Sequence, residues 1–572
     1  MFFGCACAVV LGACATAEPP PLSSGAGDYL SGRVAAGVND IAAAADKYAV
    51  AAAINPDDKD ALRQAFLYGL ASGRIDRAIP FAERLAADIE SDGLARITLA
   101  SAKIRRGDLE AAKTYLADDF NESFSKSIAY IAGIWIAAEQ GGPQKGLDAL
   151  AGGPPDVFRG FNPMIAALLA EAAGDRDAAR AAHQLSIASF AGPAGREAFG
   201  AFLERAGDAD AARSFYHILE RDRGAGRRVA RAGLARLDRK TPSKAYLNLS
   251  AAQGTAIAFY NFSGNILEQS AGERARAADA GFKVGEPQFT LPLVLAQLAL
   301  YLDPDFAPAR QLAGSILNIY GNYSAARAVL GRVPPSSPYY EQAQIDIAAS
   351  LAAEEKVSEA IALMRKAARA DRSSEEVRLT LAGLYADQGR FGEAVAAASE
   401  AIALLKPETP QDAWRFFVGR AAALIELKRW PDAEADLKRA VEIAPEEPTT
   451  LNYLGYSWAE RGENLEEAFG LIEKAVALAP NSGAIIDSLG WAHYQLGRYE
   501  EALPHLEKAA SLEPADPTIT DHLGDVYARL GRTVEAGFQW RRALELKPNE
   551  ATRAAIEKKL SEGLPPASKA PR

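Results

Sequence analysis

One pattern of large, small and helix-ending residues occurs three times in succession between Leu451 and Pro548. In each copy, the leucine of a Leu-Gly pair precedes an alanine by thirteen or fourteen residues, and a large apolar residue and a proline follow the alanine by four and twelve. The copies are Leu454-Gly455 with Ala468, Ile472 and Pro480; Leu489-Gly490 with Ala502, Leu506 and Pro514; and Leu523-Gly524 with Ala536, Trp540 and Pro548. A period of this length restricts the chain to an array of similar units.

The small residues of the pattern have a packing explanation. Gly524 and Ala536 lie where two antiparallel helices must approach closely, because a larger side chain there would force them apart. Leu523, Tyr527 and Trp540 lie at helical spacing and fill the space between one unit and the next, since one pair of helices cannot bury its apolar face alone. The pattern therefore predicts an all-α chain of stacked helical hairpins.

This pattern resembles the tetratricopeptide (TPR) repeat, a helix-turn-helix unit of about 34 residues. The resemblance implies an all-α TPR α-solenoid, a right-handed superhelix of about 12–14 helical hairpins. It also implies that other proteins or peptides bind along the concave face, which the first helix of each repeat lines.

The same period continues upstream and defines a regular array. Alanines at Ala326, Ala360, Ala394 and Ala433 extend the series, so we expect residues 305–548 to form a C-terminal array of seven repeats. The spacing grows by five residues near 405–414, which predicts a lengthened loop there. Residues 549–564 are expected to form a capping helix with a polar outer face, and residues 565–572 a disordered tail.

The N-terminal half keeps the pattern in a degenerate form. Gly32, Ala44, Tyr48 and Pro56 preserve the spacing of the C-terminal copies, and Ala78 and Ala112 follow at 34-residue intervals. We therefore expect residues 28–220 to form a second, degenerate repeat array.

Residues 221–304 lose the signature and are expected to form a divergent helical joint. Residues 221–240 carry eight basic and two acidic side chains. We interpret them as a solvated helix face rather than a membrane-surface or phosphate-binding patch, because their apolar stripe is thin. Residues 256–269 and 290–304 are expected to be buried helices, and the second is too short to cross a bilayer.

All three cysteines, Cys5, Cys7 and Cys14, lie in the first fourteen residues. The apolar run that ends in Leu11-Gly12-Ala13-Cys14 resembles the lipobox of bacterial lipoproteins. That resemblance implies a signal segment over residues 1–14, lipidation of Cys14 and outer-membrane sorting. The Pro-, Ser- and Gly-rich residues 15–27 are expected to form a flexible tether. Unlike an ordinary secretory signal, the run has no Lys or Arg before it, and the alternative is a buried helix or a chance apolar end.

Together, the lipobox and the repeats resemble the large TPR outer-membrane lipoproteins of Gram-negative bacteria. Some members of that group are adaptors of carboxy-terminal processing proteases. The resemblance implies a lipid-anchored scaffold that faces the periplasm and recruits a periplasmic protease or another cell-envelope enzyme. The alternative is a soluble cytoplasmic TPR protein that acts as an assembly chaperone or a signal-responsive interaction module.

Charge and motifs argue against other classes of function. A formal net charge of -11 disfavours binding to nucleic acid through its phosphates. The five histidines include no HExxH motif, and the sequence has no phosphate-binding P-loop and no nucleophile elbow. We therefore expect no catalytic residue, no metal and no cofactor. The expected partners are proteins or peptides, and the only membrane contact expected is through the N-terminal lipid.

Family geometry selects the residues of the last three repeats that face the groove. They form an aromatic and acidic strip, which suits protein or peptide binding because Tyr and Trp give a large contact area at low entropic cost. The strip comprises Asn452, Tyr456, Glu460, Asp487, Trp491, Tyr494, Gln495, Asp521, Asp525 and Arg529. The alternative is that these aromatic residues only cover the seams between repeats.

Two neighbouring substitutions separate packing from binding. Gly490→Leu should push the helices of its repeat apart and lower stability by about 1–3 kcal/mol or more. Trp491→Ala should change melting little and weaken partner binding by about 2 kcal/mol, and Tyr456→Ala should behave alike. Thermal denaturation and binding affinity, measured on the same variants, decide between the two. Equal unfolding by Trp491→Ala and Gly490→Leu would place Trp491 in the core.

Overall fold

The computed structural model describes residues 25–87, 92–117, 120, 122–153, 158–189, 192–221, 224–279, 290–405 and 411–565. Over these residues the chain forms thirty α-helices, one short 3-10 helix (η1, Gln411–Ala413) and no strand. The fold is therefore all-α, as the sequence predicts. The expected lipidation site Cys14, the rest of the signal segment and tail residues 566–572 lie outside the described residues.

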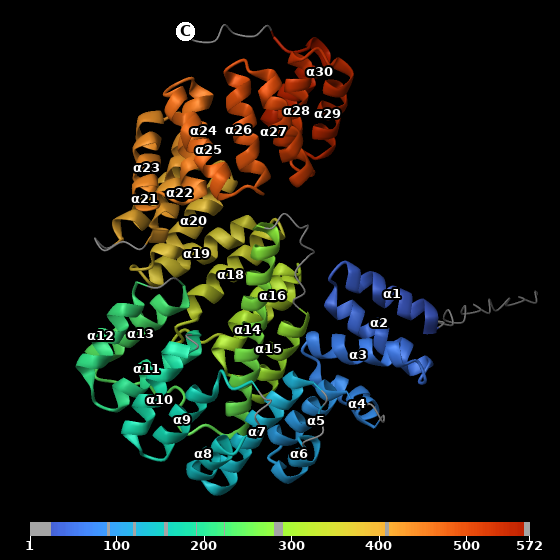
Figure 1. The fold of residues 1–572 in the computed structure, drawn as a ribbon, viewed down its shortest axis with the longest axis vertical. Helices are drawn as coiled ribbons and strands as arrows, with labels where there is room; N and C mark the ends of the chain where they lie inside the picture. Colours follow the sequence, from blue (N-terminus) through green and yellow to red (C-terminus); the bar gives the residue numbers. More distant parts are fainter. Residues whose placement is uncertain are drawn as a thin grey trace, which may run out of the picture.

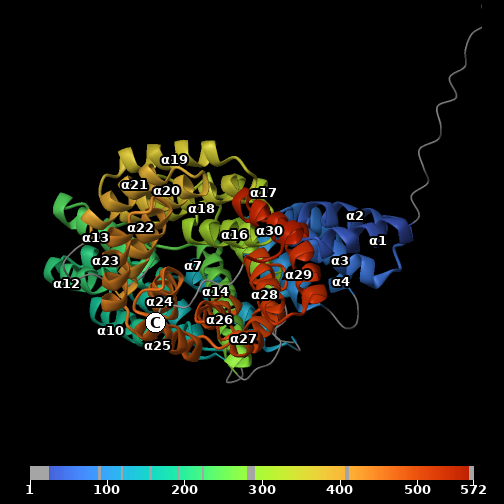
Figure 2. The same ribbon diagram turned by 90° about the horizontal axis from the view of Figure 1, so that it is seen from above.

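Six hairpins form the N-terminal array in the described residues. The first helix, α1, begins at Gly25, so residues 25–27 of the expected tether are helical. The hairpins pair α1 (Gly25–Gly37) with α2 (Ile41–Ile54), α3 (Lys59–Ala71) with α4 (Ile75–Ala86), α5 (Gly93–Arg105) with α6 (Leu109–Tyr115), α7 (Ser123–Gly141) with α8 (Pro143–Ala151), α9 (Asn162–Ala172) with α10 (Arg176–Ser189) and α11 (Pro193–Arg205) with α12 (Ala209–Leu219). Figure 1 and Figure 2 both place α1 to α4 on one side of the molecule and α12 and α13 on the opposite side.

Seven further hairpins form the C-terminal array, which extends from this half to α29 (Figure 1). They pair α16 (Ala307–Ile319) with α17 (Tyr323–Leu330), α18 (Tyr340–Ala353) with α19 (Val357–Ala370), α20 (Glu375–Asp387) with α21 (Phe391–Ala403), α22 (Trp414–Glu426) with α23 (Trp430–Ile443), α24 (Pro448–Arg461) with α25 (Leu465–Leu478), α26 (Gly483–Gln495) with α27 (Tyr499–Leu512) and α28 (Pro517–Arg529) with α29 (Thr533–Glu545). A last helix, α30 (Glu550–Glu562), packs against α29. The thirteen hairpins of the two arrays in the described residues fall within the predicted range.

The small residues of the sequence period lie where helices touch. A Cβ added at Gly490 would lie 2.6 Å from Leu506 Cγ, and one at Gly524 would lie 2.6 Å from Trp540 Cδ1. The partner in each case is the large residue four positions after the key alanine, and Ala502 and Ala536 are themselves fully buried. The close approach inferred from the sequence is therefore confirmed.

Three helices, α13 (Ala225–Arg239), α14 (Ala251–Asp279) and α15 (Thr290–Leu302), connect the arrays. Residues from Leu293 to Ala299 of α15 are buried, which confirms the buried helix expected there. α14 contains the other expected buried segment, residues 256–269, whose first half is buried and whose second half is partly exposed. No helix in the described residues combines the length and the apolar content needed to cross a bilayer.

The inner face of the N-terminal array is covered by α14 and α15. Both helices contact first helices of the N-terminal hairpins: α15 packs against α3 and α5, and α14 packs against α5 and α7. The Tyr301 hydroxyl at the end of α15 donates to Asp76 Oδ1 at 2.8 Å. Figure 1 shows α14 and α15 at the centre of the molecule, beside α7 and α16.

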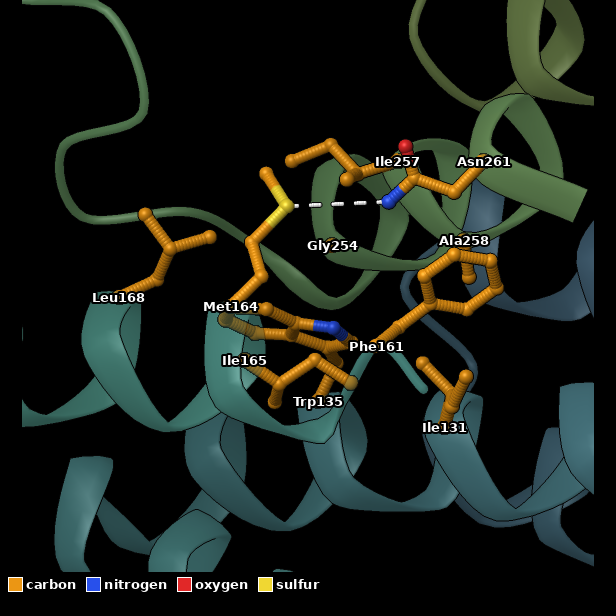
Figure 3. Close-up of a pocket in the computed structure, with 10 residues that line it drawn as sticks. All are labelled: Ile131, Trp135, Phe161, Met164, Ile165, Leu168, Gly254, Ile257, Ala258 and Asn261. Carbon is orange, nitrogen blue, oxygen red and sulfur yellow. Dashed lines mark hydrogen bonds between the residues drawn. The ribbon is translucent and has the colours of Figure 1, made fainter. Parts of the chain in front are cut away.

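Packing between these helices leaves almost no space. Figure 3 shows where α14 meets α7 and α9: Met164 lies above Trp135, and Asn261 Nδ2 donates to the Met164 sulfur at 3.7 Å. Gly254 is required here, because a Cβ at this position would lie 2.1 Å from the Trp135 ring. The remaining cavity measures about 10 Å³, roughly the space of one water molecule. The contact between α14, α7 and α9 at this point is thus closely packed core.

The basic stretch of residues 221–240 is not a solvated helix face, and that interpretation was wrong. Val229 and Ala230 of α13 are fully buried. Arg231 Nη2 lies 2.6 Å from Glu375 Oε2, and Arg227 Nη1 lies 3.1 Å from Glu375 Oε1. Because Glu375 begins α20, these ion pairs dock α13 onto the C-terminal array.

Candidate functional site

The first helices of the C-terminal hairpins form its inner layer. From hairpin to hairpin, α16, α18, α20, α22, α24, α26 and α28 contact one another, whereas the second helices make no comparable mutual contacts in the described residues. The first helices of successive hairpins are therefore closer together than the second helices, so the row of first helices forms the concave face. All ten predicted groove residues lie on α24, α26 and α28.

On α24, the predicted residues remain accessible to a partner. Glu460 is exposed, and Asn452 and Tyr456 are half-buried. Burial raises the pKa of the Glu460 carboxyl; the positive charge of His522 lowers it in part, and the neighbouring Glu426 carboxylate raises it. Two exposed carboxylates, one on α22 and one on α24, thus lie near each other, and no ion pair to either is recorded in the described residues.

On α26, Trp491 is the centre of an aromatic stack. Its ring lies 3.9 Å from the His522 ring and 4.6 Å from the Tyr494 ring, with interplanar angles of 15° and 8°. Trp491 and Tyr494 are half-buried, and Gln495 is exposed. Because His522 belongs to the next repeat, Trp491 packs at the interface between two repeats as well as facing the groove.

This stack corrects the expectation that Trp491→Ala leaves melting almost unchanged. An aromatic pair contributes about 0.5–1.5 kcal/mol beyond its buried area. We therefore expect a measurable loss of stability from Trp491→Ala, smaller than the loss from Gly490→Leu.

Two predicted acidic residues do not face an open groove. Asp521 and Asp525 of α28 are buried, and Asp525 is 3% exposed. Lys559 Nζ of α30 lies 2.8 Å from a carboxylate oxygen of each, and Trp540 Nε1 donates to Asp525 Oδ1 at 2.9 Å. The chain's own last helix neutralises these carboxylates, so their assignment to a free binding surface was wrong.

Two further charged residues of the strip, Asp487 and Arg529, are also engaged. Asp487 is buried and accepts a hydrogen bond of 2.9 Å from His522 Nδ1. Arg529 Nε donates to the Tyr494 hydroxyl at 3.1 Å, and its Nη1 donates to the Pro565 carbonyl at 2.7 Å. The accessible strip is therefore narrower than predicted: it comprises Asn452, Tyr456, Glu460, Trp491, Tyr494 and Gln495.

The sequence analysis did not predict two residues that pair with carboxylates of the strip, His522 and Lys559. His522 follows Asp487 by 35 residues, one repeat length, and this spacing could have identified the pair. Lys559 lies outside the regular repeats, and no periodic signal connects it with Asp521 or Asp525.

Three other histidines of the described chain pack against rings. His183 is buried between Phe199 and Phe202, and burial lowers its pKa to about 4. His493 stacks on His505, and the neighbouring Ser488 hydroxyl donates to the Ala484 carbonyl. Nowhere in the described residues do three His, Cys, Asp or Glu side chains gather as metal ligands would.

Comparison with known proteins places repeats of one type along the C-terminal array. Family models described as tetratricopeptide or TPR repeats match residues 351–415, 418–483 and 490–531. The TPR repeat-containing protein PA4667 of Pseudomonas aeruginosa is 42% identical over 65 residues, which are 11% of this chain and 11% of that protein.

Two further proteins are similar over longer segments. Protein O-mannosyl-transferase Tmtc1 of Drosophila melanogaster is 31% identical over 134 residues, which are 21% of this chain and 16% of that protein. The chain thus spans far less than two thirds of either curated relative. The solved APC/C hetero-tetramer Cut9-Hcn1 has a TM-score of 0.39 at 18% identity, covering 89% of this chain and 97% of that one.

The buried His522–Asp487 pair predicts a pH-dependent contribution to stability. Burial lowers the pKa of His522, but the Asp487 carboxylate, with Asp521 and Asp525, raises it overall above its ordinary value of 6.5. The ion pair therefore stabilises the fold fully below about pH 6.5, and this contribution declines as the pH rises through the raised folded pKa. Asp487→Asn should cost about 3 kcal/mol below that pH and less at alkaline pH.

Denaturant unfolding of Asp487→Asn and the unmodified chain across this pH range measures the difference. Glu500→Gln, which alters an exposed carboxylate on α27, is the matched control and should show no such trend. A cost that stays constant with pH would contradict the ion pair.

Proposed function

Because the chain is a tetratricopeptide repeat protein, we propose that it is a non-enzymatic scaffold that binds partner proteins or peptides along the concave face of its C-terminal array. One observation carries this proposal: α14 and α15 fill the inner face of the N-terminal array, whereas first helices α22, α24 and α26 pack only against neighbouring hairpins in the described residues. The C-terminal inner face is thus the one left for a partner.

The accessible residues suggest the chemistry of that partner. Tyr456 and Trp491 offer half-buried aromatic surface, and Glu426 and Glu460 offer exposed carboxylates to which no ion pair is recorded in the described residues. A partner segment with an aliphatic or aromatic side chain beside a Lys or Arg fits this surface. Its apolar side chain would cover the two aromatic rings, and its cation would neutralise the carboxylates.

We also propose that a lipid on Cys14 holds the scaffold at the outer membrane, facing the periplasm. The support is the sequence Leu11-Gly12-Ala13-Cys14 and the Pro- and Ser-rich residues that follow it. The partner class that fits this location is a periplasmic protease or another cell-envelope enzyme. The match to Tmtc1 does not favour a transferase, since it spans 16% of that protein.

Changing one carboxylate tests the groove without disturbing the core. The mature chain is used to capture partners from an envelope extract, and the affinity of each purified partner is then measured by calorimetry. Glu460→Gln should weaken binding by about 1–2 kcal/mol, because a charged hydrogen bond is lost. Glu466→Gln is the matched control, since Glu466 is exposed on α25, a second helix. Equal affinity of the two variants for every partner would reject the groove.

Metabolic labelling with a palmitate analogue tests the anchor. The unmodified chain should be labelled and should fractionate with the outer membrane, whereas Cys14→Ala should lose both properties. Cys7→Ala is the matched control and should be labelled normally, because Cys7 lies within the expected signal segment. Labelling that persists in Cys14→Ala would reject the anchor, and an unlabelled wild-type chain in the cytoplasm would support the soluble alternative.

A further inference from the structure

The first helix of the described chain, α1, has an uncovered apolar face. Leu30, Val34 and Val38 follow one another at four-residue intervals, and they are 58%, 69% and 71% exposed. Figure 1 and Figure 2 both show α1 at the outer edge of the molecule. At the other end of the chain α30 packs on the last hairpin, whereas the described residues contain no helix before α1.

The repeat period explains why this face is exposed. Val34 lies two residues after the glycine of the period, and Ala492 and Val526 have the same place in later repeats. Both are buried, and Val526 shares a core cluster with Ala502 and Leu506 of the preceding hairpin. Val34 has no preceding hairpin to pack against in the described residues, so its face is left for another apolar surface.

The charges of this face suit a surface that is both apolar and anionic. Arg33 is the one charged residue among the exposed residues of α1, although carboxylates outnumber basic side chains by 74 to 63 in the whole chain. No ion pair of Arg33 is recorded in the described residues. The acid of α1, Asp28, is buried and pairs with Lys47 at 3.2 Å. The Ser31 hydroxyl donates to the Gly27 carbonyl within the helix, so it needs no outside partner.

The sequence before α1 places this face next to a bilayer when Cys14 carries the proposed lipid. Ten residues, 15–24, separate Cys14 from Gly25, the first residue of α1. Even a fully extended segment of this length spans at most about 35 Å. A helix held so near a membrane meets it at a high effective concentration, so that a contact too weak to bind alone becomes occupied.

We propose that α1 lies flat on the membrane surface and makes a second membrane contact besides the lipid. Leu30, Val34 and Val38 enter the boundary between headgroups and acyl chains, and Arg33 lies beside the phosphate of an anionic phospholipid. This inference rests on the proposed anchor at Cys14. A second copy of the chain fits the face less well, because in a twofold contact each Arg33 would face a copy of α1 that exposes no carboxylate.

A fluorescent probe at position 34 tests the contact. All three cysteines lie at or before Cys14, so the acylated mature chain has no free thiol and Val34→Cys provides a single site for an environment-sensitive dye. The labelled lipoprotein is reconstituted in vesicles of phosphatidylethanolamine and phosphatidylglycerol. We expect a blue-shifted emission that is quenched by lipids brominated on the upper part of the acyl chain. Val534→Cys, at a valine of α29 that is 79% exposed, is the matched control and should show neither effect.

Substitutions beside the probe separate the apolar part of the contact from the charged part. With the dye at position 34, Leu30→Ser should lower the ratio of quenched to unquenched protein about tenfold, because a buried aliphatic side chain is lost. Arg33→Gln should lower it about fivefold in these vesicles and leave it unchanged in vesicles of neutral lipid. Arg541→Gln, at an exposed arginine of α29, is the matched control and should change nothing. Undiminished quenching in Leu30→Ser would overturn the apolar contact.

A synthetic anchor distinguishes failure of this contact from failure of the natural anchor. A dipalmitoylated peptide is ligated to Ala15 in place of residues 1–14, which keeps the ten-residue spacer and every described residue. Quenching at position 34 with this anchor supports the contact even if Cys14 proves not to be acylated. Quenching no stronger at position 34 than at position 534 overturns the contact even if Cys14 is acylated. A blue shift already present without lipid, in a chain that light scattering shows to be a dimer, also overturns it, because a second copy then covers α1.

Discussion

A helical hairpin with an apolar face on each side cannot be stable alone, and this constraint governs the whole chain. The apolar faces that the two helices of a hairpin turn toward each other are buried by close approach. Gly490 packs against Leu506 and Gly524 packs against Trp540, because neither glycine has a Cβ. The outer faces must be covered by neighbours. At the C-terminal end, α30 provides that cover, with Ile556 buried in the core and Lys559 reaching the two carboxylates of α28.

The chain also uses charge to join its elements. Glu375 is almost fully buried and receives Arg227 and Arg231 from α13, and Arg236 of the same helix pairs with Glu204 at 2.8 Å. A buried carboxylate left alone would be strongly destabilising, so each of these pairs requires its two elements to be docked together. The basic residues of α13 thus act as a connector between the two arrays.

Sequence periodicity predicted the parts of the fold that depend on local spacing. The phase of the glycines and alanines locates each hairpin, because the helix–helix distance within a repeat is set by contacts at a fixed and short sequence separation, such as Gly490 with Leu506 and Gly524 with Trp540. Contacts between distant segments left no such trace. α15 packs on α3, and its Tyr301 is hydrogen-bonded to Asp76 of α4 across 225 residues; no period relates those positions. The groove assignment failed at Asp525 for the same reason, since its partner Lys559 lies beyond the last repeat.

The two halves therefore differ in how their stability is distributed. In the C-terminal array, the helix contacts lie within a hairpin or between one hairpin and the next, and such an array can lose its terminal repeats while the remainder stays folded. The N-terminal half closes on itself, because α15 packs on α3 and α5. Asn322 Nδ2, in the first hairpin of the C-terminal array, donates to the Asn39 carbonyl across 283 residues and joins that array to the N-terminal one. Opening the N-terminal half would expose the buried surface of α15, so we expect this half to unfold as one cooperative unit. The surface proposed to bind a partner accordingly lies on the C-terminal array, whose repeats can change conformation one at a time. The N-terminal half, on which that array is docked, cannot do so.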